Sequence, residues 1–272
     1  MTIDPNQPAP AHDGNPLQQP PLESVSDRLS PTRSSEPPRL SIVHLFVWIA
    51  ASAVCLAAVQ NFETTSGLRE KQPTAAVTLL RACYAPFSGA AFAGLLLFID
   101  RWRRGLGFAR EPGEWLMCVY GVFIALWTGF YGLAGLVAVA WPASEVPQRA
   151  NQWAGMRLMY YWSIGVGVLE GVLFAAASRR LRAGPVWRGL FWLLAALYTL
   201  RAISAQLTWW PLGYGLSSFY LPTIAAATLI TGVTLFDWRV SLDRPWTHWV
   251  GVVVGVAAGP LAFIALLVQL YR

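Results

Sequence analysis

The sequence predicts an all-α fold, a polytopic membrane helical bundle of about seven transmembrane helices. Hydrophobic residues make up 55% of the 272 residues, and the mean hydropathy is +0.44. Charged residues make up only 12%, whereas a soluble domain carries about 25%. Apolar stretches long enough to cross a bilayer as helices recur along the chain. These observations exclude a soluble globular domain, a coiled coil and a nucleic-acid-binding protein, and they make the lipid bilayer the expected partner.

Residues 1–38 differ in composition from the rest of the chain. They contain 9 of the 19 prolines, many Gln, Asn and Ser residues, and almost no large apolar residue. Such a segment buries too little surface to offset the entropy lost on ordering. We therefore predict a disordered, Pro-rich cytoplasmic tail over 1–38 and a transmembrane helical domain over 39–272.

Seven stretches have the length and hydropathy of a membrane span. They are residues 41–60, 76–99, 115–140, 156–178, 187–209, 217–236 and 247–270. The first, third, fifth and seventh follow a proline, which suits a helix start because the N–H that proline lacks would have no intrahelical partner there. The second, fourth and sixth are followed by loops that contain arginine, and the fifth and sixth are separated only by a short uncharged loop.

The arginines predict the orientation of the bundle. Of the 20 basic residues, 13 lie in the tail and in the loops after the second, fourth and sixth spans, and 4 lie on the opposite face. Cytoplasmic loops of membrane proteins are rich in Arg and Lys, so we predict a cytoplasmic N-terminus, an outside C-terminus and a place in the cell membrane. Tryptophans near the predicted boundaries, including Trp102, Trp115, Trp187 and Trp238, fit the aromatic belts of a membrane protein.

Small residues at four-residue spacing occur in four of the predicted spans. They are Ala85, Gly89 and Ala93; Gly121, Ala125 and Gly129; Ser163, Gly167, Gly171 and Ala175; and Gly251, Gly255 and Gly259. This spacing lets helices approach each other closely in lipid. We predict a compact bundle packed through these faces, which would also allow a homo-oligomer.

Apart from Arg188, which the orientation count assigns to the loop before the fifth span, three arginines and one glutamate lie within the predicted spans, where a charge is costly and is therefore a candidate for function. Polar residues at helical spacing accompany two of the arginines, since Tyr84 follows Arg81 and both Tyr198 and Ser204 flank Arg201. The three arginines fall in the predicted outer half of the bundle. We predict a ligand-binding site formed by Arg201, Glu170, Arg81, Arg157, Tyr198, Tyr84 and Ser204.

The chemistry of this predicted site allows two interpretations. A guanidinium binds carboxylate or phosphate through paired hydrogen bonds, so the site would hold an anionic solute or a lipid headgroup, with Glu170 as the deeper counter-charge and candidate proton carrier. Alternatively, Arg81 and Arg157 extend to the outer headgroups, and Arg201 and Glu170 have a structural role. A cavity that reaches both Arg201 and Glu170 would favour binding or transport. The uncharged aromatic loop 207–222 either covers such a cavity or lies in the membrane interface.

His44 and His248 lie near the starts of the first and last spans. They either ligate a haem or metal together or are hydrogen-bonded histidines at the interface, and the second interpretation is favoured because no further ligand accompanies them. The three cysteines form no CxxC pair, and the chain contains no HExxH, GxSxG or phosphate-loop motif. We expect no metal, no cofactor and no catalytic residue.

We therefore expect a multi-pass membrane protein with an accessory, structural or sensory role and without enzymatic activity. The alternative is an anion-linked transporter of a small solute, or a membrane protein that binds an anion or a lipid headgroup.

Overall fold

The computed structural model describes residues 42–65, 75–105, 111–140, 148–181, 183–208, 216–240 and 244–270. Residues 41–272 form one compact unit. The predicted tail over 1–38 lies outside the described residues. The described helices are α2 (Ile42–Thr65), α3 (Ala75–Arg103), α4 (Pro112–Ala140), α5 (Gln148–Arg180), α6 (Pro185–Thr208), α7 (Leu216–Val240) and α8 (Trp246–Leu270).

All seven of these helices are long and apolar enough to cross a membrane. The all-helical class and the seven candidate spans are therefore confirmed for the described part of the chain. The predicted bounds agree to within a few residues, except that α5 begins at Gln148 rather than near residue 156. The loop predicted over 207–222 is too long, because α7 already begins at Leu216. Residues 209–215 of that loop lie outside the described part of the chain.

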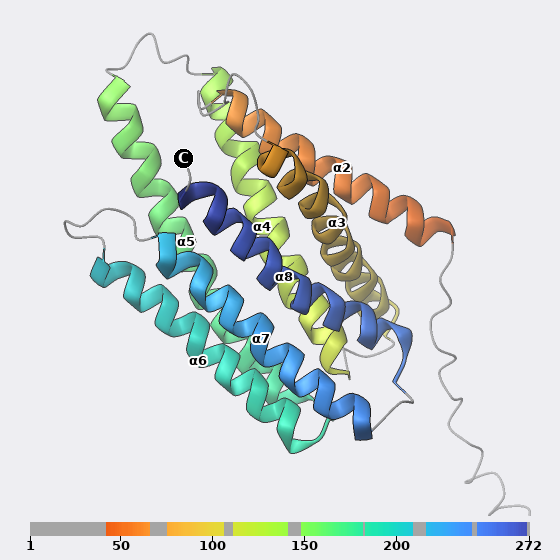
Figure 1. The fold of residues 1–272 in the computed structure, drawn as a ribbon. Helices are drawn as coiled ribbons and strands as arrows, with labels where there is room; N and C mark the ends of the chain where they lie inside the picture. Colours follow the sequence, from red (N-terminus) through yellow and green to blue (C-terminus); the bar gives the residue numbers. More distant parts are fainter. Residues whose placement is uncertain are drawn as a thin grey trace, which may run out of the picture. The chain divides into compact units, whose positions relative to one another are not determined.

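Neighbouring helices form two groups joined by α7 (Figure 1). In the first group α2, α3, α4 and α8 pack against one another, and in the second α5 packs along α6. Helix α7 contacts α8 on one side and α6 on the other, whereas α4 and α5 meet over only a short stretch although they are consecutive. This arrangement brings all seven helices around the region between the two groups.

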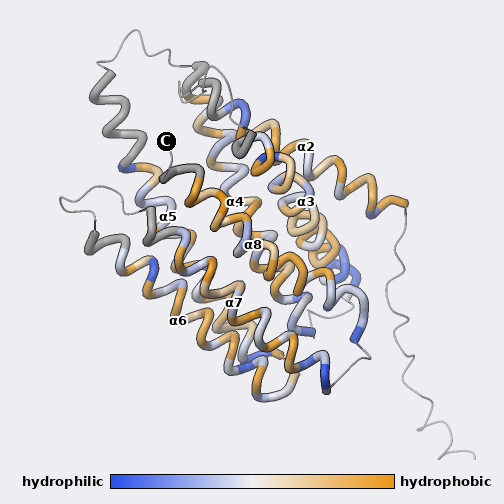
Figure 2. The backbone as a smooth tube through the Cα atoms, in the orientation of Figure 1, coloured by the Kyte–Doolittle hydropathy of each residue, from blue (hydrophilic) through white to orange (hydrophobic). Residues whose placement is uncertain are grey.

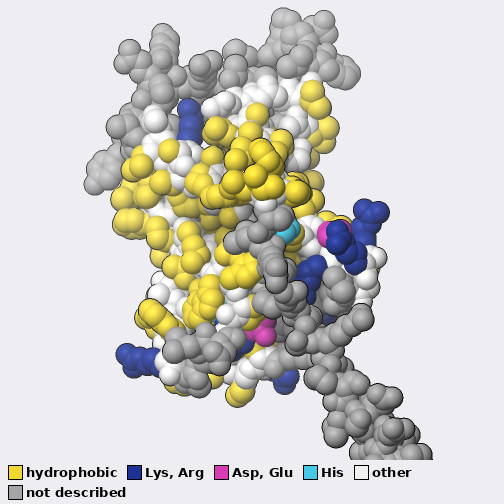
Figure 3. Space-filling model, turned by 90° about the vertical axis from the view of Figure 1, so that its right-hand side faces the viewer, with side chains coloured by type: hydrophobic (Ala, Val, Ile, Leu, Met, Phe, Trp, Pro, Cys, Tyr) yellow, Lys and Arg dark blue, Asp and Glu magenta, His cyan; other side chains and the backbone are white. Residues whose placement is uncertain are grey.

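The outer surface of the bundle is hydrophobic. Hydrophobic residues run along every helix (Figure 2), and large apolar side chains such as Val43, Leu136 and Val253 are more than half exposed. On the face shown in Figure 3, hydrophobic side chains cover much of the described surface, and the basic side chains lie near its upper left, on its right side and along its lower edge. Helices that are apolar on their outer as well as their inner faces are typical of membrane spans.

The core contains two tryptophans that the sequence analysis places in the membrane interface. Trp115 and Trp187 are each only 2% exposed and belong to the same hydrophobic core cluster as Phe191 and Leu194. Trp102 and Trp238 are 66% and 56% exposed, which is consistent with an interfacial position. The aromatic-belt prediction is therefore wrong for Trp115 and Trp187, because an indole at a helix end can face a neighbouring helix as readily as the lipid.

Helices α4 and α8 cross at two glycines. A Cβ atom on Gly251 would collide with the carbonyl oxygen of Gly113, and a Cβ atom on Gly113 would collide with the backbone of His248. One turn further along α8, Gly255 faces Ile230 of α7 and Leu116 of α4. The predicted packing of α8 through its small-residue face is thus confirmed within the chain. A homo-oligomer through such faces stays a prediction.

We expect Gly251→Ala to destabilise the bundle strongly, because the added methyl group meets backbone that cannot move aside. Overpacking of this kind costs about 1–3 kcal/mol or more. The loss of stability is measured as a lower midpoint of thermal unfolding in detergent.

The matched control is Gly129→Ala in α4, where a Cβ atom has no neighbour within 4 Å. This substitution should leave the midpoint unchanged or raise it slightly, because Ala favours a helix over Gly. Equal effects of the two substitutions would contradict the close crossing of α4 and α8.

Candidate functional site

A cavity of about 380 Å³ lies between the helices. It occupies the half of the bundle that contains the C-terminal parts of α2, α6 and α8 and the N-terminal parts of α3 and α7. Each helix contributes to its lining, with residues that include Leu56, Arg81, Tyr120, Glu170, Arg201, Tyr220 and Ala262 in chain order. Its volume lies within the range of about 300–1,000 Å³ that is usual for small-molecule sites.

Glu170 of α5 and Arg201 of α6 form a buried ion pair at this cavity. Glu170 Oε2 lies 3.5 Å from Arg201 Nη1, and each side chain is only 4% exposed. The small-residue face of α5 produces this juxtaposition, because a Cβ atom on Gly171 would collide with the Thr199 hydroxyl oxygen of α6. The two backbones can therefore approach closely at the residue that follows Glu170.

Two tyrosines continue the polar side of the cavity. The guanidinium carbon of Arg201 lies 5.7 Å from the ring centroid of Tyr198, within the range of a cation–π contact. The hydroxyl oxygens of Tyr198 and Tyr120 are 3.5 Å apart, so that α6 and α4 meet through a hydrogen bond. Phe174 stacks on Tyr198 at 5.4 Å between centroids and holds its ring in place. The polar groups therefore sit on a rigid aromatic support.

Five of the seven residues predicted for the site line this cavity, and two do not. Arg81 and Tyr84 of α3 lie on its wall together with Glu170, Tyr198 and Arg201. The grouping of these five residues agrees with the prediction, whereas their role in binding stays a prediction.

The other two predicted residues lie elsewhere. Arg157 is exposed and does not line the cavity. Ser204 donates a hydrogen bond of 3.0 Å to the carbonyl oxygen of Arg201, so it contacts its own helix instead of the cavity. The direction in which each residue faces depends on how α5 and α6 pack, which the spacing of polar residues along one helix does not define.

The sequence analysis missed the contribution of α4. Tyr120, Ile124, Trp127 and Tyr131 line the cavity and follow one another at helical spacing. A signal was present, because residues three or four positions apart share one face of a helix. It was overlooked because none of these residues carries a charge.

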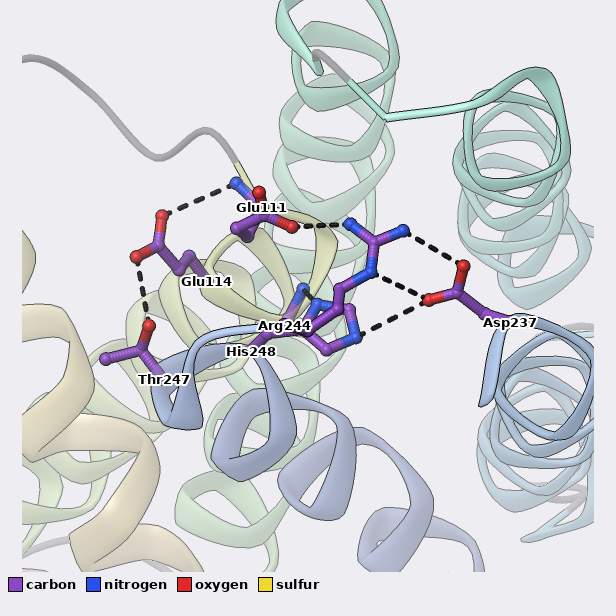
Figure 4. Close-up of polar contacts among 7 residues, drawn as sticks. Glu111, Glu114, Asp237, Arg244, Thr247 and His248 are labelled. Carbon is purple, nitrogen blue, oxygen red and sulfur yellow. Dashed lines mark hydrogen bonds and ion pairs between the residues drawn. The ribbon is translucent and has the colours of Figure 1, made fainter. Parts of the chain in front are cut away.

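A second polar cluster lies at the opposite end of the bundle, at the C-terminal end of α7 and the N-terminal ends of α4 and α8. Figure 4 shows six of its residues, Glu111, Glu114, Asp237, Arg244, Thr247 and His248. Arg244, between α7 and α8, donates two hydrogen bonds of 2.9 Å to the carboxylate oxygens of Asp237 and a third to Glu111 before α4. Glu114 accepts hydrogen bonds from Arg101 at 2.9 Å and from Thr247 at 3.1 Å. We refer to these six residues together with His248 as the α4–α8 polar cluster.

The α4–α8 polar cluster extends the set of charges inside candidate spans. Glu114 and Asp237 are 4% and 9% exposed and lie within α4 and α7, one residue beyond the predicted spans 115–140 and 217–236. Arg244 lies outside the spans. Burial lowers the pKa of Arg244, but hydrogen bonds to Asp237 and Glu111 and their negative charges raise this pKa above its ordinary value. The guanidinium therefore stays charged and holds both carboxylates.

His248 is fully buried within this cluster, near the start of α8. The backbone N–H of Gly113 donates a hydrogen bond of 3.1 Å to His248 Nδ1. In the neutral ring the proton is therefore on Nε2, which lies 3.9 Å from Asp237 Oδ2. Within the described residues no group of three or more His, Cys, Asp or Glu could hold a metal ion. The geometry assigns His248 a role in joining α8 to the start of α4.

Comparison with models of known protein families finds no match. Comparisons with curated proteins and with solved structures find no match either.

We expect Arg244→Gln to lower the stability of the bundle by about 2 kcal/mol, since a hydrogen bond to a charged group contributes about 1.5–3 kcal/mol. The substitution removes the cation from Asp237 and Glu111, which are largely shielded from water. The matched control is Arg104→Gln, whose pair with Asp100 is exposed and should contribute less than about 1 kcal/mol. Thermal unfolding of both variants in detergent tests this, and equal midpoints would contradict the structural role of Arg244.

Proposed function

We propose that this chain is a multi-pass membrane protein that binds a small anionic molecule in the cavity lined by Arg81, Glu170 and Arg201. The observation that carries the proposal is the cavity itself, because it reaches both Arg201 and Glu170 and is lined by all seven described helices. Of the two functions expected from the sequence, it supports the alternative of anion binding or anion-linked transport. The proposed role is binding rather than catalysis, and it is compatible with a sensory or accessory protein.

The charges of the cavity support an anion as the ligand. Its described lining residues include two arginines and one glutamate, and Arg stays protonated in proteins. The basic side chains among the described lining residues therefore outnumber the acidic ones. A guanidinium holds a carboxylate or phosphate through paired hydrogen bonds, so the arginines of the cavity favour an anionic ligand.

The remaining lining residues support a ligand with an apolar or aromatic part. Tyr84, Phe87, Phe123, Trp127 and Tyr131 face the cavity together with aliphatic side chains. Aromatic rings bind flat apolar groups by stacking and edge contacts, while the guanidinium groups bind the carboxylate or phosphate. An aromatic or alkyl carboxylate and a phosphate ester share this chemistry.

We infer further that the N-terminus lies in the cytoplasm of a cell and that the cavity lies in the outer half of the cell membrane. The arginine bias across the loops supports this orientation. It places the α4–α8 polar cluster at the cytoplasmic end.

An accessibility experiment tests the orientation. With a membrane-impermeant thiol reagent added to intact cells, Glu145→Cys between α4 and α5 should be labelled. Arg104→Cys after α3 should be labelled only after the cells are opened. The unsubstituted chain provides the background from its own cysteines, of which Cys55 and Cys118 are buried. The reverse pattern of labelling would show that the orientation is wrong.

Ligand-induced thermal stabilisation in detergent tests the proposed binding. Benzoate, octanoate and phenyl phosphate test for a solute, and short-chain phosphatidylglycerol tests for a lipid headgroup, all at constant ionic strength. We expect at least one anion to raise the midpoint of unfolding, because a ligand at 100 times its Kd contributes about 2.7 kcal/mol. Neutral benzamide should have no such effect.

Two variants locate the binding in the cavity. The double variant Glu170→Gln/Arg201→Gln removes both charges of the pair and should lose most of the stabilisation. Arg157→Gln removes an exposed arginine outside the cavity and should keep all of it. The proposal is wrong if no anion of the panel stabilises the protein, or if the double variant responds like the unsubstituted chain.

A further inference from the structure

The contact between Glu170 and Arg201 is long for an ion pair that is so deeply buried. The 3.5 Å between Oε2 and Nη1 exceeds the 2.7–2.9 Å that is usual for a charge-assisted hydrogen bond. Glu170 Oε2 is buried and accepts no hydrogen bond from the described residues. This carboxylate oxygen therefore depends on the positive charge of Arg201 rather than on a directed hydrogen bond.

The other groups that face Glu170 across the cavity carry either a positive charge or no charge. The lining residues on α6, α4, α3 and α7 that can carry a charge are Arg201, Tyr198, Tyr120, Tyr131, Arg81, Tyr84 and Tyr220. The cavity-lining residues of α2 are Leu and Val, and those of α8 are Leu and Ala, so neither helix contributes a charged lining residue. Glu170 is the residue that α5 contributes to the described lining. No second carboxylate is therefore present among the described lining residues to share the cations.

Arg201 and Glu170 both line the cavity, so an anion that enters it can reach the guanidinium. A bidentate contact between Arg201 and a carboxylate is stronger than the 3.5 Å contact that it would replace. Once Arg201 binds the anion, the charge of Glu170 loses most of its compensation. A buried carboxylate without a cation is so costly that such a group takes up a proton instead.

We propose that the bound anion replaces Glu170 as the partner of Arg201 and that one proton from water is taken up by Glu170 in the same event. This inference rests on the proposed anion binding and adds that one proton is taken up with each anion. Before binding, the pair consists of a carboxylate and a guanidinium, with the anion and a proton in solution. After binding, the guanidinium holds the anion and Glu170 is a neutral carboxylic acid. One O–H bond forms on Glu170 while one breaks in the hydronium ion that supplies the proton, and the net charge in the cavity stays the same.

Arg81 provides the alternative that the experiment must exclude. It lines the same cavity, and an anion bound to Arg81 alone would leave the pair of Glu170 and Arg201 intact. Binding would then take up no proton, and the cavity would gain one negative charge.

The test measures proton uptake when benzoate binds to the full chain in weakly buffered detergent solution that contains a pH indicator. Benzoate stays ionised between pH 6 and 8, so its own titration does not contribute. At a pH where Glu170 is ionised before binding, we expect one proton to be taken up for each benzoate bound, and at lower pH less than one. The Kd for benzoate should rise about tenfold per pH unit wherever Glu170 is ionised before binding, because binding and protonation are linked.

Glu170→Gln tests the assignment of the proton to Glu170. It should bind benzoate without proton uptake and with a Kd that no longer depends on pH, whereas Arg157→Gln should behave like the unsubstituted chain. The measurement on the unsubstituted chain decides the question even if Glu170→Gln does not fold. Benzoate binding without proton uptake and with a constant Kd would overturn this inference and leave the proposed binding intact. If benzoate fails to bind while another anion of the panel stabilises the protein, proton uptake is measured with that anion instead. If no anion of the panel binds, both the proposed binding and this inference are overturned.

Discussion

Close contact between helix backbones determines where the polar groups of this bundle meet. In lipid, helices gain little from burying apolar side chains, so they associate where small residues let them approach. At the crossing of α4 and α8, Gly113 contacts Gly251, and the same contact brings the N–H of Gly113 to His248. Between α5 and α6, Gly171 packs against Thr199, and Glu170 comes within reach of Arg201. Both polar groups therefore depend on contacts made by glycine.

The two polar groups differ in how completely their charges are bonded. In the α4–α8 polar cluster, Arg244 makes two hydrogen bonds of 2.9 Å to Asp237 and a third to Glu111. The pair of Glu170 and Arg201 is more deeply buried but is separated by 3.5 Å, and it borders a cavity. His248 and Ala262 lie about 21 Å apart along α8, taking 1.5 Å per residue, so the groups occupy separate ends. A cluster whose charged groups are hydrogen-bonded to one another stabilises a fold, whereas a loosely paired charge beside a cavity can exchange its partner.

The sequence predicted the helices well because each span must supply its own apolar length. It also predicted much of the cavity, because charged residues in a membrane bundle avoid lipid and therefore gather. It did not separate Arg157 from Arg201, since the direction in which each faces depends on the packing of α5 and α6. It missed Asp237 with Glu111 and Arg244, because this cluster joins segments that are far apart in the chain. Trp115 and Trp187 were misplaced for the same reason, as their burial depends on neighbouring helices.

The central claim is that an anion binds between the helices at Arg201. The most direct measurement is the anomalous diffraction of crystals grown with 4-bromobenzoate, because bromine marks the position of the ligand without reference to function. The account predicts a bromine peak inside the cavity, among the rings of Tyr84, Trp127 and Tyr131, with the carboxylate toward Arg201. A peak confined to the surface near Arg157 or to the α4–α8 polar cluster would contradict it, as would the absence of any peak at a ligand concentration that stabilises the protein.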